Sequence, residues 1–196
     1  HGQPQISDAL FLKNEEIIFT SSRSKAINET TSIDGDQFEY NRKLNALKVR
    51  GNVEINNKIE DYKLFTEEVI HEVLKQRFFT NGFTKAIIQS KYNFESRDVL
   101  FLQDQMKLSS LKKSTIKDDE SNFYKLDEFE YSINNKILKG KNILVITNHL
   151  KPKSDKTYFT NGIFNLSNKK FTSKDTKILF HKKLFDPERA TENLKD

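Results

Sequence analysis

The sequence contains no cysteine, which excludes a disulfide scaffold and a zinc site with cysteine ligands. It has only 6 Gly and 3 Pro in 196 residues, too few for a collagen-like chain or a proline-rich linker. No apolar run approaches the roughly 18 residues that a membrane-spanning helix requires. The longest run, residues 143–146, has the length of a strand.

Motifs of common catalytic and nucleotide-binding sites are also missing. There is no G-x-S-x-G, no P-loop and no G-x-G-x-x-G, and the histidines have no metal-site spacing. The adjacent carboxylates of Glu67-Glu68 and Asp118-Asp119 are typical of solvated surfaces, whereas acid–base catalysis needs carboxyl groups opposed across a cleft. The sequence therefore predicts a protein that is not an enzyme and has no cofactor and no metal ion.

What the chain does contain is charge and aromatic residues. Charged residues make up 31% of the sequence, which also has 16 Phe and 6 Tyr, more aromatics than disordered chains carry. The net charge of +5 suits an anionic partner such as nucleic acid, anionic lipid or the phosphates of lipid A. Acidic residues are interspersed throughout, so no block of the sequence resembles a nucleic-acid-binding arm.

Short segments rich in β-branched and aromatic residues alternate with polar turn clusters such as residues 34–36 and 134–136. This spacing predicts an all-β fold. Several segments alternate with period two, so that Val49, Val53 and Ile55 share one face of a strand. Residues 65–74 instead carry a helix-like apolar spacing, but their β-branched content favours a strand.

Short motifs recur along the chain. Phe19-Thr20 and Lys25-Ala26-Ile27 return 60 residues later as Phe79-Thr80 and Lys85-Ala86-Ile87. Phe79-Thr80-Asn81-Gly82 returns after 80 residues from Phe159, and Phe38-Glu39-Tyr40 returns after 91 residues from Phe129. Because these shifts differ, a regular solenoid is disfavoured, and stacked hairpin units that share one core are expected.

Several of these stretches resemble a known family. Residues 33–43 (IDGDQFEYNRK) followed by 49–55 (VRGNVEI) resemble the OstA-like (Lpt) unit, in which a strand with an aromatic pair turns into a G-N-V strand. Residues 129–132 (FEYS) and 175–182 (DTKILFHK) are similar to the N-terminal periplasmic domain of alphaproteobacterial LptD, the lipopolysaccharide-assembly outer-membrane protein. The resemblance covers residues 10–185.

The resemblance implies an elongated, twisted, open β-jellyroll, in which two V-shaped antiparallel sheets enclose an apolar groove. It implies a lipid-binding domain of a Gram-negative bacterium, located in the periplasm and attached to or associated with the outer membrane. Such a domain takes part in outer membrane biogenesis by receiving lipopolysaccharide and guiding its acyl chains to the outer membrane. The implied partners are lipopolysaccharide and other Lpt proteins, joined by edge-strand pairing: an LptA-type bridge, the outer-membrane barrel and its lipoprotein partner.

Alternating positions supply the candidate groove residues, which an ordinary closed core would also require. They are Phe38, Tyr40, Val49, Val53, Ile55, Phe129, Tyr131, Ile143, Val145, Phe159 and Ile163. The pairing edges are expected near residues 17–20 and 177–180. We further expect a flexible segment or tag remnant at 1–9, the β-jellyroll domain at 10–185 and a linker or tail at 186–196.

Three alternatives remain open on the sequence. The chain could be a stand-alone periplasmic bridge of the LptA type, or a β-rich periplasmic scaffold without lipid cargo. It could also belong to a different class, a basic β-domain that stacks single-stranded nucleic acid on its aromatic side chains, although no nucleic-acid partner is expected. A hydrophobic groove between the sheets would distinguish the lipid carrier from the scaffold.

Overall fold

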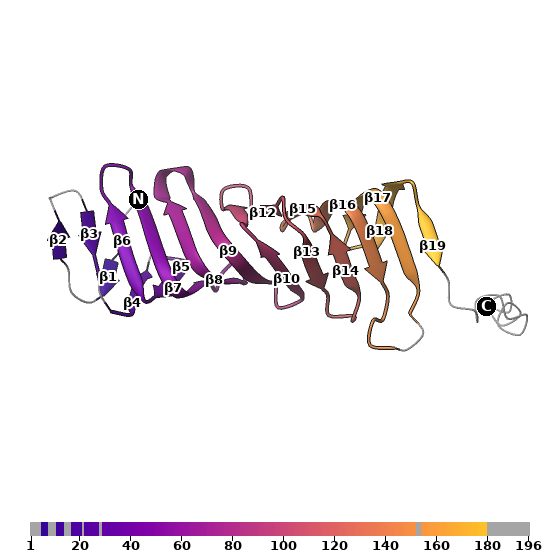
Figure 1. The fold of residues 1–196 in the computed structure, drawn as a ribbon, viewed down its shortest axis with the longest axis horizontal. Helices are drawn as coiled ribbons and strands as arrows, with labels where there is room; N and C mark the ends of the chain where they lie inside the picture. Colours follow the sequence, from indigo (N-terminus) through magenta and orange to yellow (C-terminus); the bar gives the residue numbers. More distant parts are fainter. Residues whose placement is uncertain are drawn as a thin grey trace, which may run out of the picture.

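The fold is built from β-strands alone. A computed structural model of the protein describes residues 5–7, 11–13, 17–20, 22–27, 29–151 and 154–179. Within these ranges the chain forms nineteen strands, with one 3-10 turn, η1 (Val73–Lys75), and no α-helix, hence no helix that could span a membrane. The strands follow one another along the long axis of an elongated molecule (Figure 1). The prediction of an all-β antiparallel fold is confirmed.

The strands form two antiparallel ladders. Sheet I contains, in spatial order, β1 (Gln5–Ser7), β4 (Ser24–Ile27), β5 (Thr31–Gly35), the second half of β7 (Ala46–Asn57), the first half of β8 (Tyr62–Glu72), the second half of β9 (Arg77–Ile88), β10 (Tyr92–Arg97), β13 (Ser114–Lys117), β14 (Phe123–Leu126), the second half of β16 (Ile137–Ile146), the first half of β17 (Lys156–Asn165) and β19 (Lys177–Leu179). Sheet II contains β2 (Phe11–Lys13), β3 (Ile17–Phe19), β6 (Gln37–Asn41), the first half of β7, the second half of β8, the first half of β9, β11 (Leu100–Leu102), β12 (Lys107–Ser110), β15 (Glu128–Ser132), the first half of β16, the second half of β17 and β18 (Lys170–Lys174).

The long strands β7, β8, β9, β16 and β17 bend as they pass from one sheet to the other. We call the line of bends, at Gly51–Asn52, Glu67, Gly82, Asn142 and Thr160, the crease. β7 bends where Gly51 (φ 76) and Asn52 (φ 46) take left-handed conformations, which glycine and asparagine adopt most readily. The pairing register between β7 and β8 shifts at this bend, as β-bulges produce.

The sequence repeats coincide with contacts at the crease. Thr20 and Thr80 occupy equivalent places: their hydroxyl oxygens accept from the backbone N–H of Phe38 (3.1 Å) and Val99 (2.9 Å), respectively. Asp36 and Asp127 accept from the side-chain amides of Asn52 and Asn142, both at 2.8 Å. Each repeat therefore marks a point where a short strand changes sheet against the bend of a long one, consistent with the expected stacking of hairpin units.

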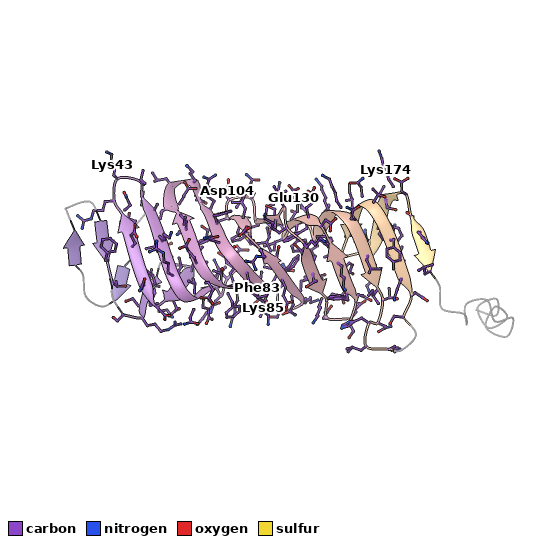
Figure 2. The ribbon with its side chains drawn as sticks, viewed as in Figure 1. Lys43, Phe83, Lys85, Asp104, Glu130 and Lys174 are labelled. Carbon is purple, nitrogen blue, oxygen red and sulfur yellow. The ribbon has the colours of Figure 1, made fainter. Side chains whose placement is uncertain are left out.

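Inward side chains from both sheets pack into one continuous hydrophobic core along the molecule (Figure 2). The largest fully buried side chains are Phe38, Leu47, Ile55, Tyr62, Leu64, Phe78, Ile88, Phe94, Phe101, Leu108, Ile116 and Tyr131. Full burial of a large apolar side chain contributes roughly 1.5–3 kcal/mol, so this layer is the main source of stability.

Residues 65–74 form most of β8 and the start of η1, so the strand prediction is confirmed. The helix-like spacing has a structural cause. Leu64 and Thr66 face the core before the register shift at Glu67, and Val69 and His71 face it afterwards. β7 and β9 each place two residues opposite the single Glu67. The buried positions of β8 therefore change from even to odd numbers at the bend, and this produces a spacing of three in the sequence.

Part of the predicted N-terminal segment forms a strand. Residues 1–9 were expected to be flexible, yet Gln5–Ser7 forms β1, which pairs with β4. The sheets therefore begin before residue 10, because three residues of this segment satisfy their backbone groups in sheet I. The predicted tail at 186–196 lies outside the described residues.

Candidate functional site

The predicted groove residues lie mainly between the two sheets. Nine of them are no more than 5% exposed: Phe38, Tyr40, Val49, Val53, Ile55, Phe129, Tyr131, Ile143 and Phe159. Val145 is partly buried and packs against the same core. The two sheets are in side-chain contact through these residues, so the interior forms a closed apolar layer in this conformation.

Ile163 does not belong to this layer. It was expected to face inward with Phe159, but it is 47% exposed and pairs with Thr172 on the outer face of sheet II. The bend of β17 at Thr160, opposite Asn142, explains the error. Phe159 is buried before the bend and Phe164 after it, so strict alternation fails across this point.

The core reaches the end of the molecule at β18 and β19. Phe171 of β18 pairs with the buried Phe164 and so faces inward, but its side chain is 50% exposed. Its ring lies 5.0 Å from that of Phe159 and 5.8 Å from that of Phe164, between centroids. Ile178 of β19 is also exposed and pairs with Thr157. We call Phe171 and Ile178 the mouth, because there the apolar layer meets solvent.

The outermost described strands are β1 and β2 at one end and β18 and β19 at the other. Among the described strands β19 pairs only with β17, as the edge expected near 177–180 requires. The edge expected near 17–20 is wrong, because β3 has neighbours on both sides, β2 and β6. Alternation within a strand does not reveal how many neighbours the strand has, so sequence could not decide this point.

On the side opposite the crease, hairpin tips of sheet I face those of sheet II along a line that we call the seam. Its described tips include residues 57–61, 89–91, 118–122 and 147–151 of sheet I and 42–45, 73–76, 103–106, 133–136 and 166–169 of sheet II. Three tyrosines of sheet I set their rings edge-on against rings of sheet II, in the pairs Tyr62–Phe101 (4.8 Å between centroids), Tyr92–Tyr131 (5.9 Å) and Tyr124–Phe164 (6.3 Å).

These tyrosines were not among the predicted site residues, although the sequence contains a signal for them. Tyr62, Tyr92 and Tyr124 follow one another at intervals of 30 and 32 residues, each after a polar turn. Their spacing matches the interval between successive hairpins of sheet I, and each stands at or near the start of its strand.

A polar network lies within the seam beside Tyr62. His71 is buried and stacks on Phe78, with ring centroids 4.1 Å apart. Its Nε2 lies 3.2 Å from Oε1 of Gln103, whose amide donates to the Tyr62 hydroxyl at 3.3 Å. Burial lowers the pKa of His71 to about 4, although the hydrogen bond with Gln103 acts in the opposite direction.

This histidine makes stability pH-dependent in a defined window. The pKa of His71 is about 4 in the folded chain and 6.5 ordinarily, so the unfolded chain takes up a proton first as the pH falls. We expect the free energy of unfolding to drop by on the order of 2 kcal/mol between pH 6.5 and pH 4. Urea unfolding at several pH values measures this loss.

His71→Gln should remove most of that pH dependence, whereas His149→Gln, in the turn that follows β16, should retain it. The pKa of Glu72 is lowered to about 2 by hydrogen bonds with Arg77 and Lys75, so its contribution is lost only at more acidic pH. Equal pH slopes for His71→Gln and the unmodified protein would contradict the assignment.

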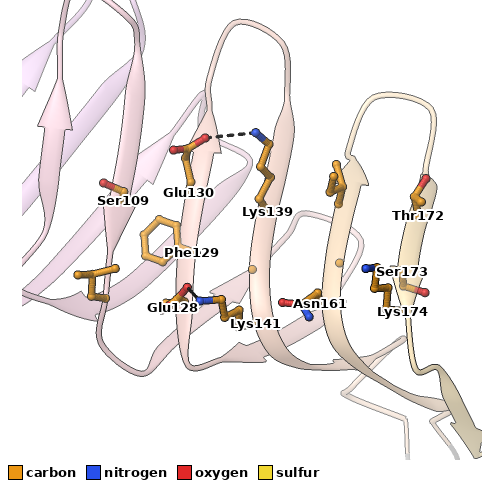
Figure 3. A pocket seen from close by; sticks show the side chains of 14 residues that line it. Ser109, Glu128, Phe129, Glu130, Lys139, Lys141, Asn161, Thr172, Ser173 and Lys174 are labelled. Carbon is orange, nitrogen blue, oxygen red and sulfur yellow. Dashed lines mark ion pairs between the residues drawn. The ribbon is translucent and has the colours of Figure 1, made fainter.

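A separate pocket of about 620 Å³ lies on the outer face of sheet II, over β12, β15, β16, β17 and β18 (Figure 3). Its borders are two rows of outward side chains, with ion pairs Glu130–Lys139 (3.6 Å) and Glu128–Lys141 (2.6 Å). These rows face away from the buried Leu138 of β16. The pocket therefore opens on the outer side of sheet II, although Phe129 and Ile163 of the predicted groove residues are among those that line it, and both charges occur on its border.

Within the described ranges, no three His, Cys, Asp or Glu side chains are grouped so that they could hold a metal ion. No protein-family model and no curated protein matches the sequence. The resemblance to the OstA-like family therefore stays a prediction, and the function proposed below depends on the geometry of the chain itself.

Proposed function

We propose that this chain is a lipopolysaccharide-transport domain of the OstA-like type. In this function it is a non-enzymatic periplasmic β-jellyroll associated with the outer membrane, and the V-shaped sheets guide lipid acyl chains through the layer between them. Edge strands join it to other Lpt domains. An LptD N-terminal domain is favoured over a stand-alone LptA-type bridge on the motifs of residues 129–132 and 175–182.

The observation that carries the proposal is the continuous apolar layer that ends in an exposed mouth. A protein that only needed stability would gain by covering Phe171 and Ile178, since exposed inward-facing apolar groups forfeit burial energy. A lipid carrier needs such an end, because an acyl chain has to pass from one apolar surface to the next without crossing water.

The energetics favour acyl chains as cargo. Burying hydrocarbon contributes about 0.8 kcal/mol per CH₂, or on the order of 10 kcal/mol for a chain of a dozen carbons. The interior is closed by side-chain contacts such as Tyr92–Tyr131 between the sheets. A chain that enters must displace these contacts, and the gross gain is large enough to offset several of them.

The sheet edges support the proposed assembly. No described strand pairs with the outer side of β1, β2, β18 or β19. Unpaired N–H and C=O groups at a sheet edge are a template for strand addition. Because both sheets reach each end of the molecule, a partner of the same architecture could extend both sheets together and continue the apolar layer.

Nucleic-acid binding, the rival class, has less support. The outward lysines and arginines alternate with carboxylates, as in Arg50 between Glu39 (3.6 Å) and Glu68 (2.8 Å). The rings that would have to stack bases, such as Phe94 and Phe129, lie inside the core. A single-stranded nucleic acid needs a basic groove with exposed rings, and the described outer faces alternate positive and negative charge instead.

Photo-crosslinking to purified lipopolysaccharide tests the proposal. A benzophenone amino acid in place of Phe171 or Ile178 is expected to crosslink lipopolysaccharide, because both side chains stand where the interior opens. The matched control is Phe83, which is 51% exposed, as Phe171 is 50% exposed, but which faces outward from β9 (Figure 2). Crosslinked product is measured by a mobility shift on gels.

Crosslinking at the mouth and not at Phe83 would support an apolar conduit. Equal crosslinking at all three positions would indicate nonspecific micelle contact and contradict the proposal. No crosslinking by a folded variant would also contradict it, and a salt-dependent assay with single-stranded nucleic acid would then test the rival class.

A further inference from the structure

The proposed function requires a route by which a lipid reaches the interior. We propose that acyl chains of an amphiphilic lipid enter sideways, through separation of the two sheets along the seam, with the crease as the hinge. This inference rests on the proposed function, and it concerns the route by which the lipid enters and not the identity of the lipid.

The crease is held by backbone hydrogen bonds. Asp36, Asp98 and Asp127 stand where the chain changes sheet, and their N–H groups donate to backbone carbonyls of the long strands, each at 3.0 Å. The five long strands also continue covalently through the crease. Separation of the sheets at this side would break backbone pairing, which is costly in a buried position.

The seam has no such pairing. The tips hydrogen-bond sideways within their own sheet, as where Gln89 N–H donates to Asp61 C=O (2.6 Å) and Leu166 N–H donates to Lys136 C=O (2.8 Å). Among the described residues, no backbone hydrogen bond joins a tip of sheet I to a tip of sheet II. The two rows of tips can therefore part without loss of any described backbone hydrogen bond.

Side chains alone hold the seam closed. The contacts at the tips are the three edge-on ring pairs of Tyr62, Tyr92 and Tyr124, the Gln103–Tyr62 hydrogen bond and one ion pair, Lys169–Glu120, at 2.5 Å. Both members of the ion pair are mostly exposed, and exposed ion pairs contribute little. The contacts among the tips are few and individually weak; behind them the sheets also pack through core rings such as Phe94 on Phe129 and Tyr131, which opening must separate as well.

Opening of the seam would relieve an unfavourable burial at Tyr131. Its ring is buried against Tyr92 of the opposite sheet and against Phe94. Its hydroxyl is buried and makes no hydrogen bond with any described residue. An unpaired buried hydroxyl disfavours the closed state, because on opening the group regains a polar partner.

A reversible lock across the seam tests this inference in the full chain. The protein has no cysteine, so Glu120→Cys with Lys169→Cys supplies a unique pair for a short, reducible thiol linker. The matched control, Glu130→Cys with Lys139→Cys, replaces another Glu–Lys ion pair (3.6 Å), but one that joins neighbouring strands within sheet II. Both pairs therefore carry the same chemical changes, and only one crosses the seam.

Two measurements distinguish opening of the seam from binding of lipopolysaccharide. Tyr131 nitration by tetranitromethane, relative to the partly exposed Tyr158, reports opening without any lipid. Binding of fluorescent lipopolysaccharide reports uptake. With the linker in place, we expect both rates to fall by about tenfold or more for the seam pair and to stay within about twofold for the control, with recovery on reduction.

Unchanged nitration of Tyr131 in the linked seam pair would overturn the inference. Slowed nitration with unchanged lipopolysaccharide binding would overturn the sideways route and assign uptake to the mouth. Slowed nitration in a protein that binds no lipopolysaccharide, linked or unlinked, would support opening at the seam and overturn the proposed function instead.

Discussion

Replacement of Phe94 by alanine is expected to lower the free energy of unfolding by about 3–5 kcal/mol. Phe94 projects from sheet I, is buried, and lies 5.4 Å from the ring of Phe129 and 5.1 Å from that of Tyr131, both in sheet II. Truncation removes ring burial and leaves a cavity where the sheets meet, and the two effects add. Urea unfolding followed by circular dichroism measures the loss.

Phe79→Ala is the matched control for this prediction. Phe79 is exposed on the outer face of β9, so its removal should change stability by no more than about 0.5 kcal/mol. If Phe94→Ala also cost less than about 1 kcal/mol, the sheets would stand apart in solution and the closed layer would not be the resting state.

Gly35→Ala is expected to destabilise the protein by about 3 kcal/mol, the upper part of the range for overpacking a core. A Cβ atom at Gly35 would lie 2.3 Å from Cγ1 of Val49, a fully buried side chain of β7. Gly35 ends β5 just before the chain crosses to sheet II at Asp36, so the backbone has little freedom to move away. The same unfolding experiment applies.

A double-mutant cycle with Val49→Ala identifies the cause. Val49→Ala alone should cost about 1–3 kcal/mol through the cavity it leaves. In the double variant Cγ1 of residue 49 is absent, so the clash is relieved. The loss of stability of the double variant should therefore be clearly smaller than the sum of the two single losses. Additive losses would show that Gly35 is required for a reason other than contact with Val49.

Alternation of apolar residues was a good guide within straight strands and a poor one across bends. Phe38 with Tyr40 and Val53 with Ile55 are buried as predicted, because successive strand side chains point to opposite faces. Ile163 is on the outer face because β17 bends at Thr160, and the change of parity at that bend moves every later residue of the strand to the other face.

The repeats of Phe19-Thr20 at Phe79-Thr80 and of Phe38-Glu39-Tyr40 at Phe129 predicted stacked hairpin units. Both lie beside the crease, where Thr20, Thr80, Asp36 and Asp127 accept hydrogen bonds. Sequence could identify these positions because each repeat satisfies the same local backbone groups. Tyr62, Tyr92 and Tyr124 were not predicted, since their signal is an interval of 30 and 32 residues spread over three hairpins, and each tyrosine acquires its partner only across the sheets.

The sequence by itself determined the secondary structure class, the absence of cysteine chemistry and most of the residues that face the core, because these depend on composition and on the two-residue period of a strand. Only the tertiary structure decided which strands lie at the edges, where each long strand bends, and that the crease is joined by backbone while the seam is joined by side chains. Those properties arise from pairings between residues far apart in the chain, and a hydrophobic period measured along one strand contains no information about its neighbours.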